Sequence, residues 1–434
     1  MRILVMGASG FIGRHLVPVL HAQGHSIICG GRRAMTSVGE RRRTTAKSCD
    51  SLVHADFTKD RTEEAWLPRL RGVDAVINAV GIFREHGAQT FEALHVEGPC
   101  ALFDACARGG VRRVIQISAL GADDEATTAF HISKRRADRH LATLPLAWTV
   151  VQPSLVYGAG GESAKLFSVL ASLPWIPLPG RGDQQVQPIH IDDVTRGIAA
   201  LLADESSARE VLPFVGPEPM ALRDFLAELR EAMGLGRAHF LPAPMTLVRG
   251  AARVGGSRSL LDNDALAMLA RGNVGDASDI TRLLGERPRP VREFVTASEA
   301  PSLRSQAQLA WLLPLARISI ALVWIVTGIV SLGLFPTESS YALLARTGVP
   351  PSLAPFALYS AATLDLALGI GTLVLRRRRL LWLAQIALIL VYTVIITVRL
   401  PEFWLHPYGP ILKNLPMLAM LYLLYRLEER PWST

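Results

Sequence analysis

Long apolar runs in the last third of the chain constrain its fold more than any other feature. The hydrocarbon core of a membrane is about 30 Å thick, so a helix that crosses it needs about 20 apolar residues. Four runs carry at most one charge each: Leu309–Leu334 with Arg317, Leu353–Leu375 with Asp365, Leu380–Val398 with none, and the shorter Ile411–Tyr425 with Lys413. An unusually apolar soluble bundle is the alternative, but Leu380–Val398 offers no polar face to water. We predict an all-α four-helix transmembrane bundle over residues 308–434.

Positive charges beside these runs predict the orientation of the bundle. Arg376–Arg379 separate the second and third runs, whereas the other two loops carry only Arg346 and, at a boundary, Arg399. Lys and Arg are enriched in cytoplasmic loops. We therefore expect a bacterial-type inner-membrane protein whose N-terminal domain and C-terminus are cytoplasmic. Inside the bundle, Arg317 and Asp365 fall at similar depths, and we expect them to pair.

The net charge of +8 does not indicate a nucleic-acid partner. Residues 301–434 hold 11 basic and 5 acidic side chains, which accounts for +6, while the first 300 residues hold 35 and 33. A protein that binds a duplex needs its positive excess on the folded soluble surface. The charge distribution instead favours a lipid bilayer as the partner.

The cysteines predict neither a metal site nor a disulfide framework. Cys29, Cys49, Cys100 and Cys106 form no Cys-x-x-Cys pair and no zinc-type set with histidine. The apolar start of the chain reaches Gly7 after a few residues, which is too short for a signal-peptide core. We expect a cytosolic first domain with reduced, mostly structural thiols.

Up to about residue 155, short apolar runs alternate with helical patterns. Strands of about 4 to 8 residues that alternate with longer helices are typical of βαβ units and a parallel sheet. The sequence therefore predicts an α/β fold with a doubly wound parallel sheet. The expected strands are Ile3–Met6, Ser26–Cys29, Ala75–Val80, Val114–Ser118 and Trp148–Val151, and the expected helices are Phe11–Gln23, Thr90–Arg108 and Asp124–Leu144.

The next part of the chain is less regular and richer in Pro and Gly. We expect a small substrate lobe over about residues 156–295, with helices near Asp192–Ala203 and Leu222–Met233. Pro288 and Pro290 lie among arginines in Gly285–Val295, a pattern typical of an exposed linker. The expected organisation is a nucleotide-binding domain over 1–295, a linker over 296–307 and the membrane domain from 308.

A glycine-rich segment follows the first predicted strand and opens the first predicted helix. It reads Gly7-Ala8-Ser9-Gly10-Phe11-Ile12-Gly13. The first glycine permits a tight turn, the second lets backbone N–H groups approach a pyrophosphate at the helix N-terminus, and the third permits close packing. We predict dinucleotide binding at this loop. A purely structural turn is the alternative.

With its G-x-x-G-x-x-G spacing, this segment resembles the extended and atypical branches of the short-chain dehydrogenase/reductase superfamily, which has a Rossmann-type fold. Further matches cover residues 1 to about 295 and include the stretch Gln187–Val194. The resemblance implies an NAD(P)-binding oxidoreductase. It also implies cofactor contacts at Gly7, Ser9, Gly10, Phe11, Ile12, Gly13, Asp56, Asn78, Ala79, Gly81, Lys134 and Pro153, and catalytic roles for Ser118 and Lys134.

Charge after the second strand bears on the choice of cofactor. An NAD enzyme typically has a carboxylate there for the ribose 2′-hydroxyl, but this chain has Arg32 and Arg33 and no acid until Glu40. An arginine suits the 2′-phosphate of NADP. We expect NADP(H) as the preferred cofactor and keep NAD(H) as the alternative. The alternative interpretation is that these arginines belong to a solvated or membrane-facing basic loop and do not select the cofactor.

The catalytic motif of the superfamily is incomplete. Its Tyr-x-x-x-Lys pattern supplies a phenol that exchanges a proton with the substrate, yet Phe130 stands four residues before Lys134. His131 and Ser133 lie nearby in sequence but point away from the Phe130 direction on a helix. His190 could serve as a base, although its apolar surroundings favour a hydrogen-bonded structural histidine. The loss of the phenol therefore affects cofactor binding less than it affects carbonyl reduction.

Two resemblances sharpen the functional hypothesis. The missing tyrosine and the glycine segment look most like the atypical group that includes the NADPH-binding accessory subunit of respiratory complex I. The last third is similar to DoxX-like domains through Arg317–Gly328 and the segment from His406 to Leu415. By analogy, this similarity implies a redox or quinone-linked role.

We therefore hypothesise a membrane-anchored oxidoreductase that moves hydride between nicotinamide and a membrane-soluble acceptor such as a quinone or lipid. The rival hypothesis is a non-catalytic NADPH-binding redox sensor or assembly factor of a membrane complex. Either function is compatible with a membrane-complex partner or with a homo-oligomer.

Overall fold

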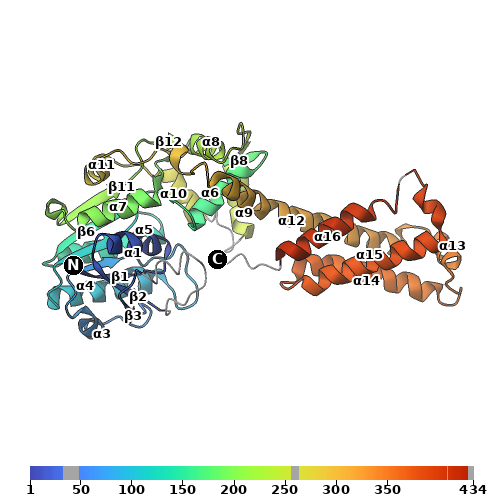
Figure 1. Ribbon diagram of the computed structural model, residues 1–434, viewed down its shortest axis with the longest axis horizontal. Coiled ribbons are helices and arrows are strands. Elements are labelled where there is room, and N and C mark those ends of the chain that lie inside the picture. Colours follow the sequence, from blue (N-terminus) through green and yellow to red (C-terminus); the bar gives the residue numbers. More distant parts are fainter. Residues whose placement is uncertain (33–47, 256–262, 408, 429–434) are drawn as a thin grey trace. The chain divides into compact units, whose positions relative to one another are not determined.

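The structure, a computed structural model, describes residues 1–32, 48–255, 263–407 and 409–428. The chain divides into two compact units, residues 1–307 and 308–434 (Figure 1). Each unit has buried apolar clusters of its own. The first contains a parallel sheet and a smaller lobe, and the second consists of helices.

A seven-stranded sheet forms the centre of the first unit. Its order is β11-β6-β5-β4-β1-β2-β3, and all its neighbours are parallel. The order reverses between β1 and β4, and such a switch point opens a crevice at the carboxyl ends of the strands. The predicted doubly wound α/β fold is confirmed. The strands are β1 Arg2–Met6, β2 Ser26–Gly31, β3 Ser51–His54, β4 Ala75–Asn78, β5 Arg113–Ile117, β6 Ala147–Pro153 and β11 Glu210–Phe214.

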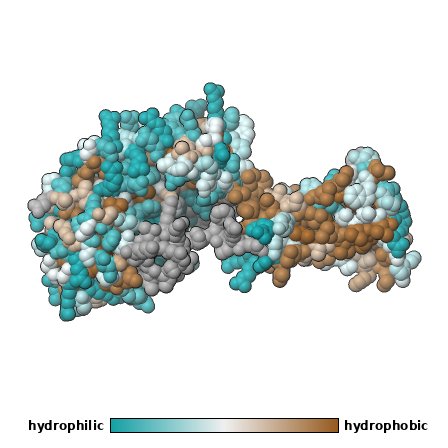
Figure 2. Space-filling model, in the orientation of Figure 1, coloured by the Kyte–Doolittle hydropathy of each residue, from teal (hydrophilic) through white to brown (hydrophobic). Residues whose placement is uncertain are grey.

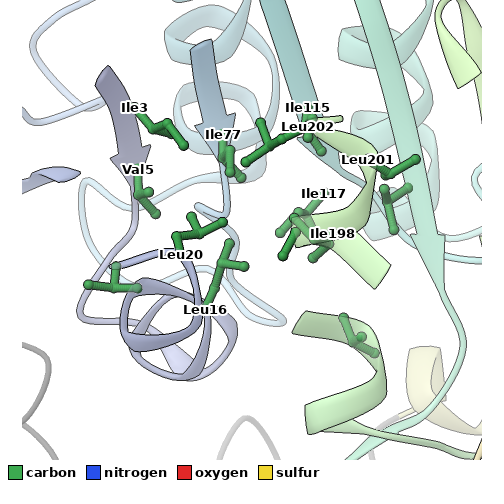
Figure 3. Close-up of a cluster of buried hydrophobic side chains, with 14 of the residues drawn as sticks. Ile3, Val5, Leu16, Leu20, Ile77, Ile115, Ile117, Ile198, Leu201 and Leu202 are labelled. Carbon is green, nitrogen blue, oxygen red and sulfur yellow. The ribbon is translucent and has the colours of Figure 1, made fainter. Parts of the chain in front are cut away.

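Helices cover both faces of this sheet, because successive residues of a strand point to opposite sides. Ile3 and Val5 lie in one buried cluster with side chains of α1 and α7 (Figure 3). Leu4 and Met6 face the other cluster, which includes side chains of α4 and α5. Burial on both faces explains the short continuous apolar runs in the sequence. The four helices are α1 Phe11–Ala22, α4 Gly98–Arg108, α5 Ala129–Thr143 and α7 Ile191–Leu201.

The lobe has its own apolar core, and the segment Gly285–Val295 belongs to it. Val291 and Phe294 are only 2% and 4% exposed, and Phe294 stacks on Tyr157 with ring centroids 5.4 Å apart. The expectation of an exposed linker at this segment is therefore wrong. The prolines interrupt regular structure, but the apolar side chains between the arginines fill the core of the lobe.

Shorter elements complete the first unit, where η marks 3-10 turns and, for η2, a π-helical turn. They are β7 Val156–Tyr157, β8 Ile176–Pro179, β9 Gln185–Val186, β10 Ile189–His190, β12 Met220–Ala221, β13 Phe240–Ala243, α3 Glu63–Trp66, η1 Leu67–Leu70, η2 Glu92–Glu97, α6 Glu162–Ser172, η3 Glu205–Ser207, α8 Leu222–Ala232, α9 Met245–Gly255, α10 Asn263–Arg271, α11 Ser278–Leu284 and η5 Val291–Glu293.

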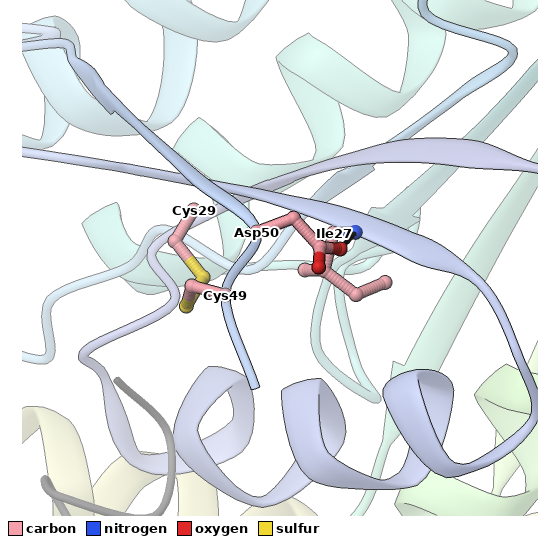
Figure 4. Close-up of a disulfide and its surroundings, with 4 residues drawn as sticks. All are labelled: Ile27, Cys29, Cys49 and Asp50. Atoms are coloured by element: carbon pink, nitrogen blue, oxygen red, sulfur yellow. Dashed lines mark hydrogen bonds between the residues drawn. A yellow bond between two sulfur atoms is a disulfide. The ribbon is translucent and has the colours of Figure 1, made fainter. Parts of the chain in front are cut away.

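Two of the cysteines form a disulfide, which corrects the expectation of four reduced thiols. Cys29 lies on β2 and Cys49 just before β3, with their Cα atoms 5.9 Å apart (Figure 4). The Ile27 N–H donates to an Asp50 carboxylate oxygen at 2.7 Å, which holds this segment against β2. Strand pairing thus brings together cysteines separated by 20 positions, which spacing alone did not reveal. Cys100 and Cys106 are free thiols.

Three helices of the second unit are long and apolar enough to cross a membrane within the described ranges: Ala300–Leu334, Ala354–Val374 and Arg379–Arg399. Most of their apolar side chains point outward, and Figure 2 shows a largely hydrophobic surface over these helices. Lipid is the environment that suits such a surface. The helices of this unit are α12 Ala300–Ile329, η6 Val330–Leu334, α13 Thr337–Thr347, α14 Ala354–Val374, α15 Arg379–Arg399, η7 Pro401–Trp404 and α16 Asn414–Glu428.

The described residues thus provide three membrane-length helices rather than the predicted four. The fourth apolar run starts at Ile411, but residues 411–413 form a turn and α16 begins only at Asn414. Its 15 residues extend about 22 Å at 1.5 Å per residue, less than the hydrocarbon thickness. Helix α12 begins at Ala300, within the predicted linker over residues 296–307.

Arg317 pairs with Glu428 rather than with Asp365. Its Nε lies 2.5 Å from Glu428 Oε1, and Glu428 also accepts from Trp382 Nε1 at 2.7 Å. Arg378, from the arginine loop, approaches the same carboxylate at 3.7 Å. A long basic side chain tends to extend toward the membrane–water boundary, which explains this choice of partner. The expected pairing of Arg317 with Asp365 is therefore wrong.

Candidate functional site

The glycine segment forms a tight cradle between β1 and α1. Gly7 has φ +77°, and the Gly10 N–H donates to the Gly7 carbonyl at 2.8 Å. A Cβ on Gly13 would lie 2.2 Å from the Gly7 oxygen, so only glycine fits there. Ser9 and Gly10 are exposed at the start of α1, whose first turn carries no acid. Free N–H groups at a helix N-terminus suit a pyrophosphate.

Residues after β4 form the floor of this cradle. A Cβ on Gly7 would lie 2.8 Å from the backbone of Ala79. Asn78 is fully buried, donates to Gln116 Oε1 at 2.8 Å and accepts from the Val80 N–H at 3.2 Å. Through these bonds Asn78 fixes the conformation of the loop after β4, whereas Ala79 and Gly81 line the cradle.

Lys134 is the buried cation of the site. Its ammonium donates to the carbonyls of Val80 at 3.2 Å and Ile117 at 3.0 Å, which leaves a third donor for a ligand. A Cβ on Gly81 would lie 3.3 Å from Lys134 Nζ, so the glycine keeps the ammonium uncrowded. Burial lowers the pKa of Lys134 to about 8.

Ser118, which directly follows β5, has a hydrogen-bond partner on α5. Its hydroxyl donates a short hydrogen bond to Asp138, which lies one helical turn after Lys134 on α5. Burial raises the pKa of Asp138 to about 6, although the bond from Ser118 and the nearby Lys134 oppose the rise. The i, i+4 spacing of Lys134 and Asp138 places both side chains on one face of a helix, and this spacing was the sequence signal that could have identified Asp138.

Phe130 occupies the place expected for the phenol and is enclosed by rings. It stacks on Phe83 with centroids 5.0 Å apart and meets Phe91 and His95 edge-on. Only 6% of its surface is exposed. The side chain therefore offers an apolar wall and no proton.

His95 is a second site residue that sequence reasoning missed. Its Nε2 accepts from the Ile82 N–H at 3.1 Å, so its Nδ1 carries the hydrogen and donates to Ser133 Oγ at 2.9 Å. Burial and the nearby Lys134 lower the pKa of His95 to about 2. The imidazole is therefore neutral and fixed in one tautomer, with Ser133 donating onward to the Phe130 carbonyl.

The opposite end of the site is more open. Arg32 is exposed and donates to Gln89 Oε1 at 3.0 Å, while Arg33 lies outside the described residues. Asp56 accepts from both the N–H and the hydroxyl of Thr58, a turn that holds it after β3. These side chains lie after β2 and β3, where the adenosine half of a dinucleotide is expected.

Two further predicted residues lie on the lobe side of the crevice. Pro153 ends β6, and its carbonyl accepts from the Leu120 N–H at 3.0 Å. His190 accepts from the Asp192 N–H at 3.3 Å through Nδ1 and caps α7. His190 therefore has the hydrogen-bonded position that the structural interpretation predicts.

The residues present fit a nicotinamide dinucleotide. The glycine cradle leaves room for a pyrophosphate beside a helix N-terminus, and the Lys134 donor lies at the same sheet edge. No group of three or more His, Cys, Asp or Glu side chains in the described parts of the chain is arranged to hold a metal ion.

Comparison with known proteins agrees with this geometry. A family model described as the NAD dependent epimerase/dehydratase family matches residues 3–212, and one described as the DoxX-like family matches residues 321–422. The chain joins an NAD-dependent epimerase/dehydratase-like domain to a DoxX-like domain. Both predicted resemblances are confirmed.

Among its relatives are a respiratory subunit and a lipid enzyme. The mitochondrial 40 kDa subunit of NADH-ubiquinone oxidoreductase from Neurospora crassa is 26% identical over 216 residues, which are 49% of this chain and 55% of that one. Ceramide reductase from Caulobacter vibrioides is 26% identical over 200 residues, which are 46% of this chain and 60% of that one. The chain thus spans a little over half the length of each of these relatives.

A solved structure shows the same fold in the first unit. A nucleoside-diphosphate-sugar epimerase from Staphylococcus aureus has a TM-score of 0.54 at 18% identity, with 68% of this chain and 99% of that chain covered. At this identity the likeness concerns the fold.

Proposed function

We propose that this protein is a membrane-anchored NADP(H)-binding oxidoreductase that moves hydride between nicotinamide and a membrane-soluble acceptor such as a quinone or lipid. The observation that carries the proposal is the glycine cradle with Lys134 and Ser118 at the same sheet edge, in a chain whose described residues also include three membrane-length helices. The similarity to ceramide reductase supports a lipid as the acceptor.

When bound, the nicotinamide would supply the hydride. Gly7, Gly10 and Gly13 would receive the pyrophosphate, and Lys134 would hold the nicotinamide ribose through its remaining N–H. Ser118 would touch the oxygen of the acceptor. Asp138, when protonated, would donate to Ser118 Oγ while the Ser118 hydroxyl passes its proton to that oxygen. This pair supplies the proton that Phe130 cannot.

The preference for NADP(H) rests on Arg32 at the carboxyl end of β2. Its guanidinium is exposed and bonds Gln89 through one nitrogen, so it can turn toward a 2′-phosphate without breaking a core contact. A charge-assisted bond to phosphate stabilises binding more than a neutral one does. Arg33 is proposed as the second contact on sequence grounds alone.

We also propose that the nucleotide domain and the C-terminus face the cytoplasm of a bacterial-type inner membrane. Two spans, α12 and α14, separate the domain from the arginine loop, so both lie on the same side. The contacts of Glu428 with Trp382 and Arg378 support a C-terminus at the arginine end of the bundle. Cytoplasmic placement of that end follows from its positive charge.

A second candidate function is favoured by Phe130, since an apolar wall in place of the phenol suits binding without turnover. The chain would then be an NADPH-binding redox sensor or an assembly factor of a membrane complex. It would act with a partner in that complex or as a homo-oligomer. The similarity to a subunit of NADH-ubiquinone oxidoreductase supports this alternative.

Turnover assays on the detergent-solubilised full chain separate the two functions. Purified protein is mixed with NADPH and either a short-chain quinone or a keto-sphingolipid, and loss of reduced nicotinamide is followed by absorbance. We expect oxidation that depends on one acceptor class and is lost in Lys134→Met. Tight NADPH binding without oxidation by any acceptor would establish the binding-only function. Phe130→Tyr, which restores the phenol, should then raise carbonyl reduction.

A further inference from the structure

The substrate lobe presents an apolar surface that the protein core does not use. β8 and β13 pair in parallel, with Leu241 opposite Pro177. Ile176 and Leu178 of the same ribbon are buried in the lobe, so alternate residues face outward. The outward set includes Trp175 at 63% exposure and Leu241 at 55%. We call Trp175, Pro177, Leu241 and the following Leu247 the apolar edge of the lobe.

Helix α9 continues this edge directly after β13. Leu247 is 67% exposed, whereas Met245 and Val248 are half-buried. An amphipathic helix normally covers its large apolar side chains with its own domain. A helix that leaves a leucine two-thirds exposed directly after a ribbon with exposed apolar side chains is typical of the membrane–water interface. Other exposed apolar side chains of the unit, such as Val211 and Leu52, lie on separate strands.

The charges around the edge identify what would cover it. Residues 236–255 include Arg237, Arg249 and Arg253 and no Asp or Glu. Arg237 and Arg249 are exposed, and neither makes an ion pair with another described residue. Exposed apolar groups together with unpaired arginines match a bilayer that carries anionic headgroups.

The lobe is also joined to the membrane through a continuous helix. Ala300 and Leu303 of α12 pack partly against the core of the lobe. The same helix continues as the candidate span Ala300–Leu334. Only about six residues, or about 9 Å of helix, separate Leu303 from the apolar run that starts at Leu309. The covalent connection through α12 therefore keeps the lobe near any bilayer that this span crosses.

We infer that the apolar edge of the lobe, with Arg237 and Arg249, is a bilayer-contacting surface that inserts into the headgroup region of an anionic membrane. Trp175 and Leu247 are the anchors, and the arginines contact the lipid phosphates. A second copy of the chain on this edge is the competing occupant. The two occupants predict different outcomes when the edge is labelled.

The test uses variants of the full chain that each carry one added cysteine. Leu241→Cys and Leu247→Cys, labelled with bimane, are placed in phosphatidylcholine/phosphatidylglycerol vesicles that contain nitroxide-labelled phosphatidylcholine. Val211→Cys is the matched control, because Val211 is 50% exposed but lies on β11 of the sheet. The wild-type chain, treated in the same way, measures labelling of the native thiols.

We expect at least about twofold quenching at positions 241 and 247 and background quenching at position 211. Arg237→Glu combined with Arg249→Glu should lower the quenching at position 247 toward that of the control. Equal quenching at positions 211, 241 and 247 would overturn the inference. So would cross-linking between copies at position 247 without quenching, which would assign the edge to a homo-oligomer.

Discussion

The two ends of the proposed nucleotide site, which we call the nicotinamide end and the adenosine end, are built differently. At the nicotinamide end, Lys134, Asp138 and His95 are buried and each bonds another part of the fold. At the adenosine end, Arg32 is exposed and bonds only one side chain among the described residues. The nicotinamide end is therefore fixed by the core, whereas side chains at the adenosine end can be substituted without loss of folding stability. The glycine cradle serves both ends.

The largest effect is expected where the two ends meet. Gly13→Ala would place a Cβ 2.2 Å from the Gly7 oxygen, so the turn must open and the pyrophosphate contacts are lost. We expect NADPH and NADH affinity to fall together by about 10- to 100-fold, measured by calorimetry. Gly250→Ala is the control, because a Cβ there meets nothing within 4 Å. An intact affinity in Gly13→Ala would place the cofactor elsewhere.

Next in size is the loss of the buried cation. Lys134→Met removes the donor to Val80 and Ile117 and leaves Asp138 without its nearby positive charge. We expect the free energy of unfolding of the nucleotide domain to fall by about 2–4 kcal/mol, measured by denaturant titration. Lys165→Met, at an exposed position of α6, should change it little. Equal stability of the two variants would show that the nicotinamide end is not fixed by the core.

A smaller effect concerns pH. Because burial raises the pKa of Asp138 to about 6, the folded state binds its proton more tightly than the unfolded state does. The stabilisation that proton binding to Asp138 contributes is therefore complete below about pH 4, falls as pH rises toward 6 and is absent above. Asp138→Asn should remove this part of the pH dependence, on the order of 1–3 kcal/mol, measured by thermal unfolding at several pH values. An unchanged pH profile would contradict the burial argument.

The smallest effect on the fold is expected at the adenosine end. Arg32→Ala should weaken NADPH about tenfold and NADH much less, with an unchanged melting temperature, because Arg32 is exposed and supports no core contact. Competition binding with both nucleotides measures the ratio. Equal losses for both would reject the assignment of Arg32 to the 2′-phosphate.

Local pattern predicted the elements well but could not pair distant side chains. The sheet and the membrane-length helices follow from periodicity, and Gly13 follows from the turn that it must allow. His95 was missed because its partners, Ile82 and Ser133, are set by tertiary packing. The same limit hid the pairing of Cys29 with Cys49.

The sequence pattern also did not reveal how the helices of the second unit pack. Depth along a helix suggested Asp365 for Arg317, but the arginine extends to Glu428 at the end of α16. The start of α16 was also misjudged, since an apolar run does not show where a turn delays the helix. Both errors concern the ends of α16, and the periodicity of apolar residues does not show where a helix begins or which charges meet at its end.

The π-helical turn η2 has a consequence for chain length. A π turn holds one residue more than an α turn, and η2, which contains His95, runs directly into α4. Deleting one residue from η2 would restore α-helical winding and rotate the segment before α4 by about 100°. His95 would then leave Ile82, while Leu102 and Ala105 kept their places in the core. Homologues that retain this imidazole should therefore tolerate substitutions in η2 but not single-residue deletions.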